Sequence, residues 1–133
     1  MGFQTELFSR PRPSEQARYR AALPPIVITE SGAAYSDEPD ADGTVDDQLR
    51  IDYLAAHLRA VQQAIQRGVD VRGYYCWSLL DNFEWAEGLT QRYGLVHVDF
   101  ETLVRTPKKS FYWYAAGIAA QATLAEPDTP ATG

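Results

Sequence analysis

Two segments of the chain combine strand-like apolar patterns with carboxylates or tryptophans. In the first, three β-branched residues starting at Ile26 lead through a threonine to Glu30, and a glycine follows two residues later. This pattern predicts a buried strand that ends in a carboxylate and a turn, and α/β enzymes place their chemistry at the C-terminal ends of parallel strands. The second segment begins with Trp77 and ends in Glu84 and Trp85. Tryptophan faces beside carboxylates indicate a sugar-binding pocket, so carbohydrate chemistry is the leading hypothesis.

The same residues allow a plainer interpretation. Glu30 would then cap the turn that follows the strand, and Trp77 and Trp85 would be core aromatic residues. Asp81 and Asn82, which lie between the two tryptophans, are expected to form and support the turn rather than contact a ligand. The occurrence of both segments in one chain is what favours catalysis and sugar binding.

The remaining residues capable of metal or nucleophilic chemistry are expected to serve the fold. The acidic stretch 37–47 lacks the regular alternate spacing of a calcium loop, and it is predicted to be a solvated loop. His57 is predicted to be solvated, His97 to be structural, and Cys76 to be an inert thiol in a buried strand. With only two histidines and one cysteine, we expect neither a metal site nor a cofactor.

Length, charge and composition limit the class of protein. The 133 residues suffice for one small domain, whereas a complete eight-fold (β/α) barrel needs roughly 250. The net charge is −6 and the basic residues are scattered, which argues against a nucleic-acid partner. No apolar run approaches the ~20 residues of a membrane span, and the first residues do not resemble a secretory signal. One cysteine fits a reducing compartment, so a cytoplasmic location is expected.

Hydrophobic periodicity and turn residues predict alternating helices and strands. The clearest helix runs from about 47 to 67, because Leu54, Leu58, Val61 and Ile65 form one apolar stripe at helical spacing before a terminal glycine. In chain order, the predicted elements are an irregular segment 1–13, a helix 14–22, a strand 26–29, a loop 31–45, the helix 47–67, a strand 69–79, a loop 80–93, an extended segment 94–100, a helix 107–120 capped by Thr106, and a frayed tail from 122. Two successive strand–helix units predict a right-handed parallel crossover, and hence an α/β slice of a larger barrel.

Both motifs resemble the C-terminal part of the family 1 glycoside hydrolases, the β-glucosidase family. The run from Ile28 to Gly32 is similar to the Ile-Thr-Glu-Asn-Gly motif that ends barrel strand seven, with Ser31 in place of asparagine. The run from Trp77 to Trp85 matches the strand-eight motif without change, and Arg105 to Lys108 matches the opening of the last helix. The resemblance covers about residues 24–120 and implies strands seven and eight of a (β/α)8 TIM barrel with their helices. It divides the chain into an irregular segment with a short helix, 1–23, a barrel part, 24–121, and a flexible tail, 122–133.

The resemblance also implies roles for individual residues. Glu30 corresponds to the catalytic nucleophile, Trp77 to the platform under the sugar, and Glu84 to a residue that holds sugar hydroxyls. Trp85 would donate its indole N–H to another hydroxyl, and Tyr93 would line the aglycone side, where the family commonly has phenylalanine. The family's general acid/base lies in an Asn-Glu-Pro motif, and the sequence contains no such triplet.

These assignments imply a β-glucosidase-type retaining hydrolase of β-glucosides or oligosaccharides, present as a C-terminal portion with the nucleophile but without the acid/base. Two alternatives stay open, a non-catalytic carbohydrate-binding module and a fragment that completes a barrel with another chain. The second alternative predicts association through open strand edges, either with a partner or with itself. Phospho-sugar members tend to carry basic residues near the position of Glu87, so this glutamate favours a neutral sugar but leaves the glycone undetermined.

Overall fold

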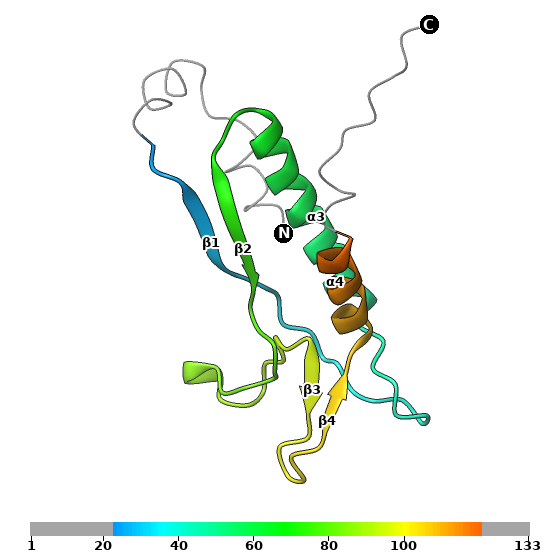
Figure 1. The fold of residues 1–133 in the computed structure, drawn as a ribbon. Helices are drawn as coiled ribbons and strands as arrows, with labels where there is room; N and C mark the ends of the chain where they lie inside the picture. The colour runs from blue at the N-terminus through cyan, green and yellow to red at the C-terminus, as the bar shows by residue number, and fades with distance from the viewer. Residues whose placement is uncertain (1–22, 121–133) are drawn as a thin grey trace, which may run out of the picture.

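The computed structural model describes residues 23–120 (Figure 1). The helix predicted at 14–22 and the tail predicted from 122 lie outside these residues, so the proposed divisions at 23/24 and 121/122 stay predictions. In chain order, the described elements are β1 (Ile26–Ser31), α3 (Gln48–Gln66), β2 (Val71–Cys76), the short 3-10 helix η1 (Trp85–Glu87), β3 (Val96–Val98), β4 (Arg105–Pro107) and α4 (Lys109–Ala119). This order confirms the predicted alternation of strands and helices, and it adds the strand β4.

β1, α3 and β2 form one parallel strand–helix–strand unit. The two strands pair in parallel, with Ile26 opposite Val71 and Ile28 opposite Tyr74. α3 and α4 contact each other and lie on the same side of this two-stranded sheet (Figure 1). Within the described part of the chain nothing covers the other face, and Val27 is 48% and Tyr75 62% exposed. A parallel sheet normally has both faces covered, so this unit has the form of a slice of a larger layer.

β2 is shorter and less buried than the apolar pattern predicts. It covers six residues rather than 69–79, and Arg72 and Tyr75 are exposed. The pattern is typical of a strand buried on both faces, but the described helices cover only one of them. Cys76 is therefore half-buried, and burial raises the pKa of its thiol to about 11. The thiol stays protonated at neutral pH, as expected for an inert cysteine.

α3 agrees best with its sequence pattern. Gly68 follows the helix with φ of 88°, the left-handed conformation expected of a C-terminal glycine. Leu54 is fully buried, but Ile65 is 48% exposed, and Ala64 is buried beside it instead. The predicted stripe therefore faces the interior only along the first part of the helix. No helix between residues 23 and 120 combines the length and the apolar character needed to cross a bilayer.

His57 packs on its own helix instead of being solvated. Its ring stacks on that of Tyr53 with the centroids 3.9 Å apart. Its Nδ1 lies 2.8 Å from the carbonyl oxygen of Tyr53, one helical turn earlier. The prediction of a solvated histidine was wrong, because residues four apart on a helix are neighbours and can cover each other.

β3 and β4 form an antiparallel hairpin beside the parallel unit (Figure 1). His97 in β3 is opposite Thr106 in β4. The sequence predicts Thr106 and Pro107 as the start of the last helix, but both lie in β4, and α4 begins at Lys109. The prediction was wrong because a Thr-Pro pair also suits an edge strand, where proline needs no N–H for the ladder.

Six charged side chains, largely withdrawn from solvent, form the centre of the fold. Lys108 Nζ lies 2.7 Å from an oxygen of Asp37 and 3.1 Å from an oxygen of Asp81. Arg50 is hydrogen-bonded to Asp37 and to a second aspartate of its own helix start. Buried charges are tolerated only when they are well paired, so these contacts specify the arrangement of the chain. This ionic core consists of Asp37, Asp47, Arg50, Asp81, Arg92 and Lys108.

Two aspartates of the acidic stretch 37–47 belong to the ionic core, so the prediction of a solvated loop was wrong for them. Asp37 is 6% and Asp47 3% exposed, whereas Asp40 and Asp46 are exposed as predicted. Through these contacts the segment after β1 is tied to the segment after β2 and to the start of α4. The ionic core therefore holds together the segments that leave the ends of both parallel strands.

Candidate active site at the ends of β1 and β2

The C-terminal ends of the two parallel strands bring the two sequence motifs together. Ser31, the last residue of β1, pairs with Cys76, the last residue of β2. The backbone N–H of Trp77 donates to the carbonyl oxygen of Ser31 at 2.9 Å. Glu30 is exposed at this end of the sheet. The strand pattern predicted this shared edge, and the structure places Glu30 and Trp77 on it.

β1 is irregular immediately before its end. Ile28 pairs with Tyr74 and Ser31 with Cys76, so three steps along β1 match two steps along β2. Glu30 lies within this irregular stretch. An extra residue of this kind re-aims a side chain relative to a regular strand and is common next to functional sites.

Gly32 continues the chain in close contact with the backbone of Trp77, directly after β2. A Cβ atom at this position would lie 1.9 Å from the carbonyl oxygen of Trp77. Only glycine permits this approach, so the motif's glycine fixes the path by which the chain leaves β1.

Trp77 and Glu84 form a hydrogen-bonded pair. The indole N–H of Trp77 donates to Oε1 of Glu84 at 3.0 Å. The backbone N–H of Glu84 in turn donates to the carbonyl oxygen of Gly88 at 2.7 Å, which closes the loop around η1. The peptide bond between Trp77 and Ser78 is cis. The hydrogen bond from the indole holds a flat aromatic surface and a carboxylate side by side in the loop after β2.

The other two predicted sugar-binding residues are less closely attached to this pair. Trp85 is 87% exposed and has φ of 42°. Tyr93 accepts a hydrogen bond on its carbonyl oxygen from the N–H of Ser78 at 3.2 Å, so its backbone lies beside the start of the loop. Among the described residues, no hydrogen bond joins the Glu30 carboxylate to Trp77, Glu84 or Trp85.

Asp81 and Asn82 support the loop after β2, as the sequence predicts. Asp81 is 4% exposed and accepts hydrogen bonds from the backbone N–H groups of Gly94 and Val98 at 2.8 and 3.3 Å. Asn82 donates to the hydroxyl of Ser78 at 2.9 Å. These contacts join both side chains to other parts of the same segment, so they hold the loop that carries Glu84.

Tyr74 is a residue of this region that sequence reasoning missed. Its hydroxyl donates to Oγ of Ser31 at 2.9 Å, across the two strands. Burial raises the pKa of Tyr74 to about 12, an effect that the hydrogen bond with Ser31 partly opposes. No pattern in the sequence signals this pair, because the partners are far apart in the chain. Lys108 of the ionic core was also missed as a buried residue, although the motif that contains it was noted.

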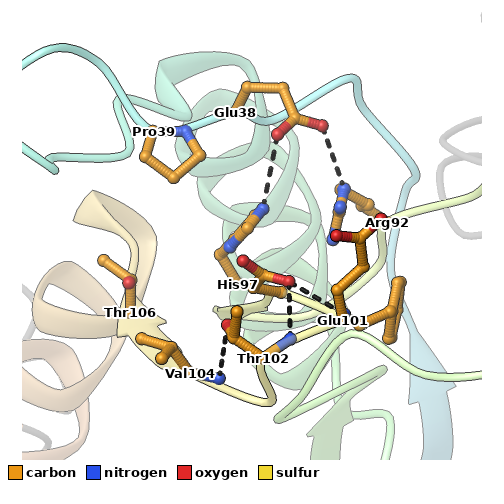
Figure 2. A pocket seen from close by; sticks show the side chains of 10 residues that line it. Glu38, Pro39, Arg92, His97, Glu101, Thr102, Val104 and Thr106 are labelled. Atoms are coloured by element: carbon orange, nitrogen blue, oxygen red, sulfur yellow. Dashed lines mark hydrogen bonds and ion pairs between the residues drawn. The ribbon is translucent and has the colours of Figure 1, made fainter.

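A separate hollow of about 570 Å³ lies between the segment after β1 and the β3–β4 hairpin (Figure 2). Glu38 faces Arg92 and His97 across it, with 3.4 Å between Glu38 and Arg92 and 3.6 Å between Glu38 and His97. His97 is 4% exposed, which agrees with its predicted structural role. None of the site residues predicted from the sequence lines this hollow. In the part of the chain that the structure describes, no group of three or more histidine, cysteine or acidic side chains is placed to hold a metal ion.

Comparisons with known proteins identify relatives that share these motifs. The model of glycosyl hydrolase family 1 matches residues 15–123. The chain is 55% identical over 92 residues to β-glucosidase A of Thermotoga maritima, a match that spans 69% of this chain and 21% of that protein. It is 53% identical over 90 residues to 6-phospho-β-galactosidase of Staphylococcus haemolyticus, spanning 67% of this chain and 19% of that protein.

A solved structure shows the same relationship. The family 1 β-glucosidase of Thermotoga maritima matches with a TM-score of 0.73 at 47% identity, over 80% of this chain and 24% of that chain. The chain therefore spans about a fifth of the length of the curated relatives that it matches, and its strands and helices are a partial piece of the TIM barrel of those enzymes. A family model that covers most of the sequence, and relatives more than half identical over the matched region, show that the chain belongs to glycosyl hydrolase family 1.

Proposed function

We propose that the chain is the C-terminal portion of a β-glucosidase-type retaining hydrolase, in which β1 and β2 are barrel strands seven and eight. The observation that carries this proposal is the position of Glu30 and of the Trp77–Glu84 pair on one edge of a parallel sheet. That edge is where barrel enzymes assemble their active sites. Glu30 would be the nucleophile, and its exposure at the strand end supports the proposal because an attacking carboxylate has to reach the sugar.

In the proposed site, the residues after β2 bind the sugar. Trp77 would offer its ring face to the apolar face of the sugar, while Glu84, held by the indole N–H, would accept hydrogen bonds from hydroxyls. Trp85 would donate its indole N–H to a further hydroxyl, and Tyr93 would line the aglycone side. The relatives include β-glucosidases and a 6-phospho-β-galactosidase, and the negative Glu87 favours a neutral β-D-glucosyl residue over a phosphorylated sugar.

The second carboxyl group that the reaction requires has no candidate among these residues. Retaining hydrolysis needs two carboxyl groups about 5–5.5 Å apart, one to attack the anomeric carbon and one to protonate the leaving oxygen. Glu84 accepts a hydrogen bond from Trp77, which suits binding better than proton donation. The sequence has no Asn-Glu-Pro triplet, so we expect the 133-residue chain to hydrolyse unactivated disaccharides very weakly or not at all.

The nucleophile can be tested without the missing acid. The chain is incubated with dinitrophenyl 2-deoxy-2-fluoro-β-glucoside, and its intact mass is measured. A carboxylate oxygen of Glu30 forms a bond to the anomeric carbon while the bond to dinitrophenolate breaks, and this leaving group departs with the electron pair without needing a proton. We expect an adduct that maps to Glu30 and is lost in Glu30→Gln. An adduct at another residue would contradict the assignment of Glu30, and no adduct would mean that the rest of the barrel is required to build the site.

A second candidate function is the completion of a barrel with another chain. It is favoured by the uncovered face of the β1–β2 sheet, where Val27 and Tyr75 are exposed, and by the open edges of both strands. The test is co-expression with β-glucosidase A of Thermotoga maritima that lacks the corresponding last fifth of its chain. Co-purification and recovery of glucosidase activity would support it, and a clean monomer without activity would refute it. The cytoplasmic location and the absence of nucleic-acid and membrane partners stay proposals from composition.

A further inference from the structure

The position of Glu30 depends on how β1 ends. Glu30 lies in the irregular stretch between the pairs Ile28–Tyr74 and Ser31–Cys76, so regular strand pairing does not fix its orientation. Among residues 23–120, its own carboxylate has no hydrogen bond or ion pair that would hold it. Within the described residues, its orientation is therefore set by the backbone on either side, and above all by the first residue that is again paired with β2.

Ser31 is that residue, and it is held at two points. Its carbonyl oxygen accepts the N–H of Trp77 at 2.9 Å, and its hydroxyl accepts the Tyr74 hydroxyl at 2.9 Å. The first contact is backbone and would form with any residue at position 31. The second contact requires both a hydroxyl on residue 31 and a tyrosine two residues before the end of β2.

Tyr74 is itself anchored in the layer between the sheet and the helices. It is half-buried, and besides this burial the side chains of Tyr53 in α3, Cys76 and Tyr114 in α4 lie close enough to its phenol to raise the pKa of Tyr74. Tyr75, the next residue, is on the opposite face and is 62% exposed. The hydroxyl of Tyr74 thus reaches Ser31 from a fixed point of the fold, whereas that of Tyr75 does not.

We propose that Tyr74 is a positioning residue for Glu30, which it orients through its hydrogen bond to Ser31. This role deepens the proposed function, because it concerns the same carboxylate. The family motif that this sequence resembles has asparagine at the position of Ser31. In this chain, the hydrogen bond from Tyr74 holds the residue after the carboxylate. A small displacement of a reacting group can cost one to two orders of magnitude in rate.

The test compares Tyr74→Phe and Ser31→Ala, which each remove the hydrogen bond, with the control Tyr75→Phe, which removes an exposed hydroxyl from the adjacent residue. With the fluoroglucoside, we expect the rate constant for labelling to fall roughly tenfold in the first two variants, with the dissociation constant of the reagent unchanged. The double variant should be no slower than either single variant, because both lose the same bond. Ser31→Thr keeps the hydroxyl and should retain the rate.

A second readout decides the proposal even if the wild-type chain takes no label, because it does not depend on the reaction. The carboxyl ¹³C and backbone amide signals of Glu30 are recorded by NMR for each variant. We expect both signals to shift in Tyr74→Phe and Ser31→Ala and to stay in place in Tyr75→Phe and Ser31→Thr. Glu30 signals that are the same in Tyr74→Phe as in Tyr75→Phe would overturn the proposal.

Discussion

Replacement of Lys108 by methionine tests whether the ionic core holds this fold together. The Lys108 side chain is fully buried, and its Nζ lies 2.7 Å from an oxygen of Asp37 and 3.1 Å from an oxygen of Asp81. Methionine keeps most of the apolar stem and removes the charge. Two buried carboxylates then lose the cation between them.

The expected loss of stability follows from the two buried carboxylates that remain without the lysine. Removal of one member of a buried, hydrogen-bonded ion pair costs about 3–5 kcal/mol, because the partner keeps its charge without compensation. Arg50 and Arg92 still neutralise part of this charge, so we place the loss near the lower end, about 3 kcal/mol. In a domain of this size such a loss lowers the melting temperature by roughly 12–24 °C, at about 4–8 °C per kcal/mol.

The assay is urea denaturation followed by tryptophan fluorescence, with Lys109→Met as the matched control. Lys109 is the next residue and also has one ion pair, to Asp46 at 2.9 Å, but both side chains are about half exposed. An exposed pair is worth less than about 1 kcal/mol, so the control should unfold close to the wild-type midpoint. If the two methionine variants unfold at the same urea concentration, the ionic core does not stabilise the fold as we infer.

Three further outcomes are expected. Gly32→Ala should lower the free energy of unfolding in the same urea assay, because the added Cβ would clash with the backbone of Trp77. Gly117 lies in α4 with open space around its Cα, so Gly117→Ala should raise the free energy of unfolding by roughly 0.5–1 kcal/mol. Alkylation of Cys76 by iodoacetamide should be slow at pH 8 and should accelerate up to about pH 11, since burial raises the pKa of its thiol to about 11; full reaction at pH 8 would contradict this. The pKa of Tyr74 is raised to about 12 from an ordinary 10.0, so the folded state holds this proton more tightly, and the stability that it contributes is complete below pH 10 and is lost as pH rises towards 12. The free energy of unfolding of Tyr74→Phe should therefore depend less steeply on pH in this range. An unchanged pH dependence would refute the raised pKa of Tyr74.

Sequence reasoning worked where the deciding interactions are local. The helical period and Gly68 predicted α3, and the apolar run before Glu30 predicted β1. The motif from Trp77 to Trp85 was predicted at the end of a strand over 69–79, and the structure places it just beyond the strand, because β2 ends at Cys76. In each case, residues within a few positions of one another determine the backbone conformation.

The predictions that were wrong concern burial and strand pairing, which depend on residues distant in the sequence. Asp37 is buried because Lys108, 71 positions later, supplies its counter-charge, and no local pattern separates it from the exposed Asp40. The strand β4 was missed for a similar reason, since only its pairing with β3 distinguishes it from the start of a helix. β2 is also less buried than its apolar pattern predicts, because that pattern is typical of a strand covered on both faces and the described helices cover only one.

Some parts of the candidate active site are held in place by contacts among the described residues, and other parts are not. The Trp77–Glu84 hydrogen bond joins residues seven positions apart, and the Tyr74–Ser31 hydrogen bond joins two paired strands, so both are made within one strand–helix–strand unit and its loop. The ionic core holds that loop through Asp81, which accepts hydrogen bonds from Lys108 and from the backbone N–H of Gly94. By contrast, Trp85 is almost fully exposed, and the described residues offer the carboxylate of Glu30 no partner. If the proposed function is correct, groups outside the described residues 23–120 complete the site around these two residues. Sugar affinity and labelling should then improve together when a complementing barrel chain is added, while the Trp77–Glu84 pair should already be present without it.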